Sequence, residues 1–178
     1  KDVSEFDTLE ELKKDIAEKL AEEAKNRAQA EKERLAVDKV VEESEFELPK
    51  SFLDIRMDQM LDGFVGQLAR QGISFQQYLD ITGTSVEDLR NQFKDRAEKE
   101  VKTELVLEAI IKKEQIEVTE EELNKEYEQI AEQTKQTADK VRAMYEKNEE
   151  WLDSLKYSLK LNKAVQLLTK EAEFILEE

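Results

Sequence analysis

The chain has 178 residues, of which 40% are charged and 39% hydrophobic, and its formal net charge is −16. A charge of this sign repels phosphate backbones and anionic lipid head groups, so we expect no nucleic acid and no membrane surface as a direct partner. The sequence contains no His and no Cys, which excludes the commonest general base, a thiolate nucleophile and a disulfide framework.

Residue usage predicts an all-α fold, because four Gly and one Pro leave little turn material for a sheet protein. No run approaches the ~20 apolar residues of a membrane span, and the first residues lack the features of a signal peptide. We therefore expect a cytoplasmic protein. The chain starts at Lys1 rather than at Met, so we expect it to be a piece of a longer protein.

The first predicted helix is long. Thr8 and Glu11 form a capping box, and the helical pattern behind them continues to about Ser44. We call this segment the strut helix. Its narrow apolar seam consists of Leu9, Leu12, Ile16, Leu20, Ala24 and Ala28. The alanines allow a partner helix to approach closely but contribute little apolar area.

A second helix is predicted from Pro49 to Gly72, since Pro favours a helix start and Gly a helix end. One apolar arc of this helix carries Leu53, Met57, Met60, Leu61, Phe64 and Leu68. Phe52, Ile55 and Val65 lie off that arc and form a second apolar surface. We expect this second surface either to be covered by another helix or to form one wall of an open groove.

Short segments joined by tight turns come next. Ser74 with Gln77 predicts a helix that ends at Gly83, and Thr84 with Glu87 predicts the cap of the following one.

That following helix is expected to run from about Ser85 to Gln115. Its stretch from Leu105 to Ile111 is apolar on nearly all sides, so we expect the deepest core there. The pattern breaks near Ile116, and Thr119 with Glu122 predicts the next cap.

Two further helices complete the pattern. A short one carries Val141, Met144 and Tyr145, and a last one is expected to begin at Asn148 with an apolar stripe that reaches Ile175. The whole pattern predicts two helical hairpin units attached to the strut helix.

For any single apolar residue of the helix from Pro49 to Gly72, burial in a core is the favoured interpretation. As a set, apolar residues of the two hairpin units are candidates for lining an open groove, in which flexible methionines adapt to different partners. The candidates are Phe52, Ile55, Met57, Met60, Phe64, Leu68, Ile130, Val141, Met144 and Tyr145. Each contact is weak, so several have to act together.

Carboxylate chemistry is the remaining enzymatic interpretation. Adjacent acids such as Glu10 with Glu11, or Glu120 to Glu122, are of the type that acts as an acid and base pair or binds Mg²⁺. At helix starts, however, acids complement the helix dipole. We favour this structural role and expect no catalytic residue, no metal and no cofactor.

Several ordered segments resemble one known family: DVSEFDTLEELKKDI, FELPKSFLDIRMDQML, RAEKEVKTELVLEAIIKKEQIEVTEEE and MYEKNEEWLDSLKYSLKLNKAVQLL. They are similar to the carboxy-terminal domain of bacterial trigger factor, a ribosome-associated chaperone that receives nascent chains. The resemblance implies an elongated helical body with two arms around a cradle. It places the body and strut helix in residues 1–48, arm 1 in 49–116, arm 2 in 117–169 and the C-terminal end in 170–178.

The resemblance also implies which residues face a client, meaning an unfolded or nascent polypeptide. The matching positions are Ile130, Val141 and Met144 in arm 2, with Tyr145 beside them, and Met57, Met60 and Leu68 in arm 1. The family's ribosome-docking and FK506-binding-protein-like isomerase domains have no counterpart in the sequence. We therefore expect no isomerase activity and ribosome contact only through the missing amino-terminal domain. In the intact family, a helix from before the isomerase domain runs beside the strut helix. Its absence would leave the seam at Ala24 and Ala28 exposed, which implies a possible homodimer.

Two functions from different classes are consistent with these features. The first is an ATP-independent holdase, a chaperone domain that binds unfolded segments in an apolar cradle and releases them by weak exchange. The alternative is a helical scaffold or adaptor that binds one folded protein through the strut helix.

Overall fold

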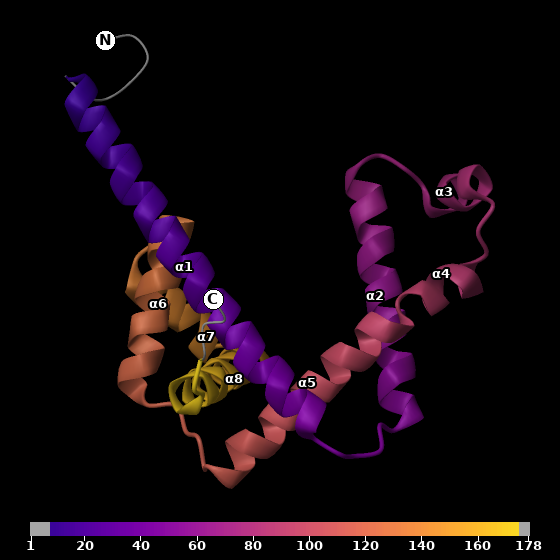
Figure 1. Cartoon of the computed structure of the whole chain (residues 1–178). Coiled ribbons are helices and arrows are strands. Elements are labelled where there is room, and N and C mark those ends of the chain that lie inside the picture. The colour runs from indigo at the N-terminus through magenta and orange to yellow at the C-terminus, as the bar shows by residue number, and fades with distance from the viewer. Residues whose placement is uncertain (1–7, 175–178) are drawn as a thin grey trace.

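The computed structural model describes residues 8–174, and within them the chain forms eight α-helices and no strand (Figure 1). The prediction of an all-α fold is confirmed. The helices are α1 (Leu9–Glu43), α2 (Lys50–Arg70), α3 (Phe75–Thr82), α4 (Val86–Gln92), α5 (Lys94–Lys113), α6 (Glu120–Thr134), α7 (Ala138–Glu146) and α8 (Glu149–Glu171).

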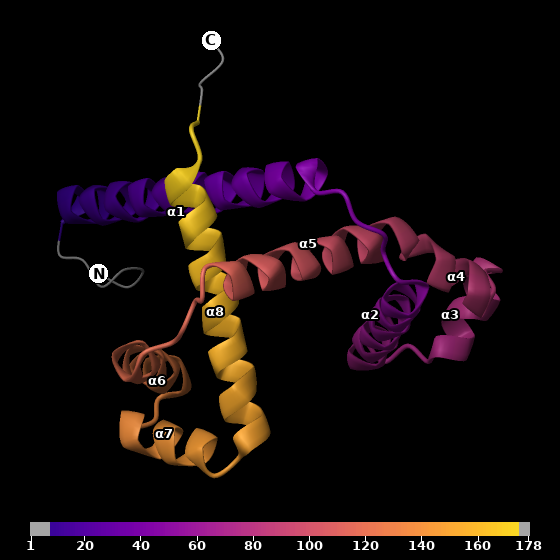
Figure 2. The ribbon, with the colours of Figure 1, turned by 90° about the horizontal axis from the view of Figure 1, so that it is seen from below.

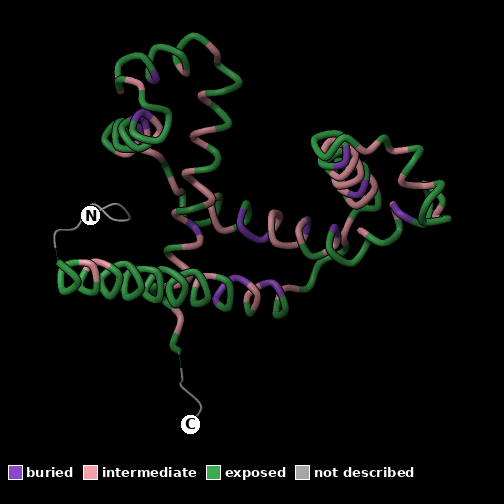
Figure 3. The backbone as a smooth tube through the Cα atoms, turned by 90° about the horizontal axis from the view of Figure 1, so that it is seen from above, coloured by how far each residue is buried: buried purple, intermediate pink, exposed green. Residues whose placement is uncertain are grey.

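The strut helix is α1. Its start is the predicted capping box, in which the Thr8 hydroxyl accepts from the Glu11 backbone N–H and the Glu11 carboxylate accepts from the Thr8 backbone N–H. Its end is at Ser44, as predicted. Buried residues are confined to its C-terminal part, where Val37 and Val41 join the body core. The N-terminal part extends away from the other helices and is largely exposed (Figure 3).

The body core forms where α1, α5 and α8 meet. Val37 and Val41 of α1 pack there with Val106 and Leu107 of α5 and Ala164 of α8. Ile110 and Ile111 pack against the same cluster. The prediction of a core in the stretch from Leu105 to Ile111 is thus confirmed, because α5 needs apolar side chains on several faces where two helices cover it. The predicted stripe residue Ile175 lies outside the described residues.

The helix from Pro49 to Gly72 is α2, which packs against α3, α4 and α5. Pro49 occupies its N-cap position, and Gly72 follows its end with a φ of +76°. The capping box of Ser74 and Gln77 starts α3, and Gly83 ends it in the left-handed conformation. These predicted boundaries are confirmed.

The segment from Ser85 to Gln115 is two helices rather than the single helix that we predicted. Phe93 is both the C-cap of α4 and the N-cap of α5, and the Phe93 ring lies 6.2 Å from the Phe64 ring of α2. The break lets α4 and α5 both pack on α2, which one straight helix would not do. The N-cap of α4 is Ser85, whose hydroxyl accepts from the Asp88 backbone N–H, rather than the predicted Thr84.

A second, separate core joins α6, α7 and the first part of α8. Its buried residues are Leu123, Tyr127, Ala131 and Val141. The capping box of Thr119 and Glu122 starts α6, and the Asn148 side chain accepts from the Trp151 backbone N–H at the start of α8. Both caps are as predicted.

The helix α5 runs between two groups of helices, one made of α2, α3 and α4 and the other of α6, α7 and the start of α8 (Figure 2). At one end α5 packs on α8 and α1, and at the other on α2 and α4. The group of α2, α3 and α4 and the group of α6, α7 and the start of α8 project to the same side of the rod formed by α1 and α5 (Figures 2 and 3). We propose to keep residues 49–116 as arm 1 and residues 117–169 as arm 2.

Candidate functional site

The main apolar arc of α2 is interior. Met57 and Leu68 are buried against the helices that cover α2. Phe64 is half-buried, with its ring 5.1 Å from the Tyr78 ring of α3, and Met60 is also half-buried. This corrects the prediction that Met57 and Leu68 line an open groove. The arc with helical periodicity is the one that α3, α4 and α5 cover.

The second apolar surface of α2 stays open to solvent at Phe52 and Ile55. Their side chains are 50% and 57% exposed, whereas Val65 is half-buried. Phe52 and Ile55 form one wall of a cavity of about 230 Å³, and Val101 and Leu105 of α5 form the opposite wall. The facing wall therefore comes from α5 and not, as we predicted, from α6 and α7.

Val141, which was also predicted to line the groove, lies in the interior of arm 2. Val141 is 2% exposed and packs with Leu123 and Tyr127 of α6. Ile130 is partly buried against the same cluster. Val141 is therefore a core residue of arm 2, which corrects the prediction that it faces open space, since α7 directs this residue at α6.

Three large side chains of arm 2, those of Met144, Tyr145 and Trp151, are exposed or half-buried. Met144 is 41% exposed and Trp151 is 49% exposed. The half-buried ring of Tyr145 lies 6.3 Å from Trp151 and 5.8 Å from Tyr127, so it joins this surface to the core. Tyr145 and Trp151 line a cavity of about 430 Å³ together with Leu155 and two serines.

Trp151 was missing from the residues predicted for the site. Trp151 lies in the first turn of α8, where its backbone N–H donates to the side chain of the cap residue Asn148. One available signal was its position: Trp151 directly precedes Leu152, which lies in the core stripe, so the two side chains are about 100° apart around the helix. A large aromatic at that angle is placed beside the core rather than inside it.

A third cavity, of about 520 Å³, lies between α2, α5 and α8. It is lined by Arg56 of α2, by Leu161 of α8, and by a run of α5 residues between them. These are Arg96, Lys99, Glu100, Thr103, Glu104 and Leu107. Apolar side chains of α5 and α8 thus meet there with charged groups of α2 and α5.

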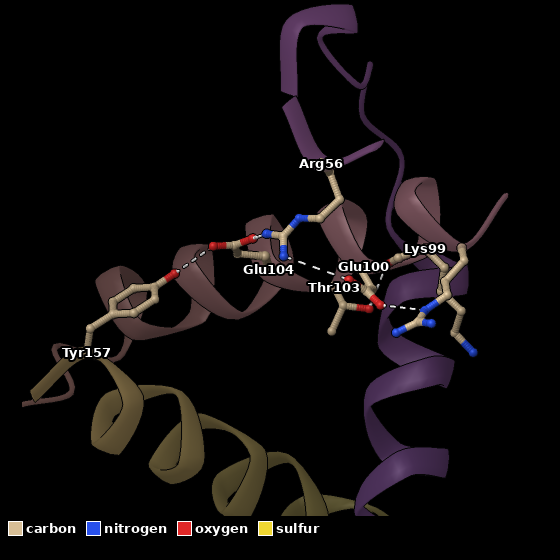
Figure 4. A network of polar contacts seen from close by, with 7 residues as sticks. Arg56, Lys99, Glu100, Thr103, Glu104 and Tyr157 are labelled. Carbon is tan, nitrogen blue, oxygen red and sulfur yellow. Dashed lines mark hydrogen bonds and ion pairs between the residues drawn. The ribbon is translucent and has the colours of Figure 1, made fainter. Parts of the chain in front are cut away.

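Polar contacts run along the edge of this third cavity (Figure 4). The Arg56 guanidinium contacts the Glu104 carboxylate and lies 3.8 Å from that of Glu100. From α8, the Tyr157 hydroxyl donates to Glu108 Oε1 at 2.7 Å and lies 3.4 Å from Glu104 Oε1. Partial burial and the neighbouring carboxylate of Glu108 raise the pKa of Tyr157 above its usual range. Tyr157 therefore remains a neutral hydrogen-bond donor at physiological pH.

Three carboxylates have pKa values below their usual range because each accepts a hydrogen bond from a basic side chain. Hydrogen bonds from Arg34, Lys102 and Lys163 lower the pKa values of Glu31, Glu98 and Glu122 respectively, and that of Glu122 falls to about 2. A general acid at neutral pH requires the opposite shift. No group of three potential metal ligands occurs among residues 8–174, and those residues include no buried polar side chain. The shifted carboxylates of Glu31, Glu98 and Glu122 therefore act in ion pairs within and between helices.

Residues 8–170 match the family model described as the C-terminus of bacterial trigger factor protein. The chain belongs to this family. Trigger factor of Desulforamulus reducens is 43% identical over 175 residues, which are 98% of this chain and 40% of that protein. Trigger factor of Clostridioides difficile is 43% identical over 172 residues, again with 40% of that protein covered. The resemblance stated from the sequence segments is thus confirmed.

Solved trigger factor structures share the fold. A structure of trigger factor domains from Thermotoga maritima matches with a TM-score of 0.58 at 24% identity, covering 95% of this chain and 98% of that one. A second, from work on promiscuous substrate recognition by the trigger factor chaperone, matches with a TM-score of 0.61 at 25% identity, covering 96% and 40%.

The chain spans about 40% of the length of the curated relatives named above. The matched part is the family's C-terminus, and the family's isomerase domain lies outside the matched region. Among the helices of residues 8–174, none combines the length and apolar character needed to cross a bilayer.

Proposed function

We propose that this chain is an ATP-independent chaperone domain that holds unfolded or nascent polypeptides through separate apolar patches on its two arms. The observation that carries the proposal is the exposure of Phe52 and Ile55 on arm 1 and of Met144 and Trp151 on arm 2. Large apolar side chains that gather on a surface mark a place where something binds. Membership of the trigger factor family supports the same conclusion.

The two patches suit weak and reversible binding. Burying one large apolar side chain contributes ~1.5–3 kcal/mol, while ordering a flexible client costs several kcal/mol. One patch alone is therefore a poor binder. A client long enough to reach both arms gains from effective concentration, and its release requires no nucleotide because each contact exchanges by itself.

The predicted site residues divide into two roles under this proposal. The surface role belongs to Phe52, Ile55, Ile130, Met144 and Tyr145, which are exposed or half-buried, with Trp151 added; Met60 and Phe64 are half-buried on the covered arc of α2. Met57, Leu68 and Val141 support these residues from the interior of the arms.

The test is aggregation suppression by surface variants. Phe52→Ser with Ile55→Ser removes the arm 1 patch, and Met144→Ser with Trp151→Ser removes the arm 2 patch. A matched control is Ile81→Ser, because Ile81 is an isolated apolar side chain of α3 that is 82% exposed.

Light scattering of a chemically denatured client is followed as it is diluted into each variant, and circular dichroism checks helicity. We expect each patch variant to lose most of the suppression with its helicity intact, and the control to retain it. Full suppression by the variant that lacks all four side chains would refute the proposal.

The alternative function, an adaptor for one folded protein, is favoured by a different observation. Leu9, Ile16 and Leu20 are exposed along the N-terminal part of α1, which the other helices leave free (Figure 1). Substituting these three residues by Ser would abolish binding to a folded partner, or self-association as a homodimer, and leave client suppression unchanged. Loss of suppression in this variant would instead extend the client surface onto α1.

The proposal also covers the natural clients of the chain, its contact with the ribosome and its compartment. We propose that clients include nascent chains, and that ribosome contact depends on parts of the relatives that this chain does not match. The cytoplasm is the compartment in which such clients occur.

A further inference from the structure

Three carboxylates form a row on one face of α5. Glu100, Glu104 and Glu108 are spaced by four residues, so they lie above one another on the same side of the helix. Like charges at this spacing repel each other unless other groups neutralise them. Three groups offset this repulsion: the Arg56 guanidinium of α2 and the Arg96 guanidinium of α5 carry positive charge, and the neutral Tyr157 hydroxyl of α8 donates a hydrogen bond.

The Glu104 carboxylate contacts both α2 and α8. One of its carboxylate oxygens, Oε2, receives the Arg56 guanidinium of arm 1, and the other, Oε1, faces the Tyr157 hydroxyl of arm 2 at 3.4 Å (Figure 4). The main packing partners of α2 are α3, α4 and α5, whereas those of α8 are α1, α5 and α7. Both helices thus pack on α5, α2 toward one end and α8 toward the other, and Glu104 contacts both of them.

The contact lies in a partly desolvated place. The side chains of Arg56 and Glu104 are 29% and 37% exposed, so neither is a fully solvated surface group. Both line the cavity of about 520 Å³ to which Leu161 of α8 also contributes. The same two residues line the cavity beside Phe52 and Ile55. The pair thus separates the patch on arm 1 from the space between the arms.

We propose that Glu104 is a positioning residue that holds α2 and α8 at a fixed spacing, and with them the patches of the two arms. That this spacing serves client binding rests on the function proposed above. A fixed spacing keeps the two patches within reach of one extended segment, which is the condition for gaining affinity from two weak contacts. Without Glu104, each arm retains its own packing but loses the shared contact.

Distances between spin labels test the positioning role directly. The sequence has no Cys, so Ala69→Cys in α2 and Lys140→Cys in α7 give two unique and exposed labelling sites. The background protein is compared with Glu104→Gln, Arg56→Gln and the control Arg96→Gln. Arg96 pairs with Glu100 at 2.9 Å within α5, so its loss removes an ion pair of the same row without removing a side chain of α2 or α8.

We expect Glu104→Gln and Arg56→Gln to broaden and shift the distance distribution, and Arg96→Gln to leave it unchanged. The double variant Arg56→Glu, Glu104→Arg restores the pair with its charges exchanged, and we expect it to recover most of the narrow distribution. This recovery distinguishes positioning from general destabilisation. A distribution in Glu104→Gln that equals the background overturns the proposal.

Aggregation suppression by the same unlabelled variants separates this proposal from the proposed function. Changed distances with reduced suppression support both. Changed distances with full suppression uphold the positioning role and count against a client site shared by the two arms. Unchanged distances overturn the positioning role whatever the suppression, because the distances are measured without a client.

Discussion

Replacement of Val141 by Ala tests whether this residue belongs to the core of arm 2 or to its binding surface. The side chain is 2% exposed and packs with Leu123, Tyr127 and Ala131. Val141→Ala removes two methyl groups from this cluster and adds no new contact. A core role predicts a loss of stability, while a surface role predicts a loss of client binding at unchanged stability.

The magnitude follows from the buried volume. Each buried CH₂-sized group contributes ~0.8 kcal/mol, so the transfer loss is about 1.6 kcal/mol. The space left behind adds a cavity term, which brings the expected loss to roughly 2–3 kcal/mol. The core of arm 2 is separate from the core formed by α1, α5 and α8. The loss should therefore appear first in arm 2.

Two probes separate arm 2 from the whole chain during urea unfolding. Trp151 is the single Trp and contacts the Tyr145 ring, so its fluorescence reports on arm 2 alone, whereas circular dichroism reports on all helices. We expect the fluorescence midpoint of Val141→Ala to fall further than the circular dichroism midpoint. The control Met144→Ala, at an exposed site, should change stability by less than ~0.5 kcal/mol. An equally small effect of Val141→Ala, combined with weaker client binding, would refute the core assignment.

Other predictions concern the ends and surfaces of helices. Gly83 has a φ of +66° and open space around it, so Gly83→Ala should cost about 1–2 kcal/mol in a thermal melt through backbone strain alone. Because the bond to Lys163 lowers the pKa of Glu122 to about 2, its stabilisation is present above its usual pKa of 4.5 and lost as the pH falls towards 2; Glu122→Gln should flatten stability over that range. Arg90→Gln should lower the midpoint of a thermal melt only slightly, since its pairs with Asp54 and Asp58 are partly exposed.

Local signals in the sequence predicted most helix boundaries. The capping boxes at Thr8, Ser74 and Thr119 involve side chains and backbone groups three residues apart, so each is complete within one turn. The left-handed Gly83 is likewise a local requirement of the chain. Such features need no knowledge of the rest of the fold, and they occur where the sequence placed them.

The break at Phe93 was not predictable in the same way. The apolar stripe continues through it without a Gly or Pro, and the Phe93 ring at the break lies beside Phe64 of another helix, a neighbour that no local pattern specifies. The same limit applies to the site. Val141 and Met144 lie on one short helix, yet one is buried and the other exposed, because only the position of α6 decides between them.

Periodicity identified the apolar faces correctly but not their partners. The arc of α2 that holds Met57 is interior, and the off-arc residues Phe52 and Ile55 are exposed, as a helix with excess apolar surface requires. That α5, rather than arm 2, supplies the wall opposite Phe52 depends on the crossing of α2 and α5, which no local pattern encodes.

The strong negative charge and the exposed patches are physically connected. Apolar patches on a monomer promote association with other copies, and a net charge of −16 opposes it through repulsion between like molecules. The repulsion acts between two copies of this chain but not between the chain and a neutral or basic unfolded segment. Under the function proposed above, the charge therefore leaves Phe52 and Trp151 available to clients and discourages their burial against a second copy of the chain.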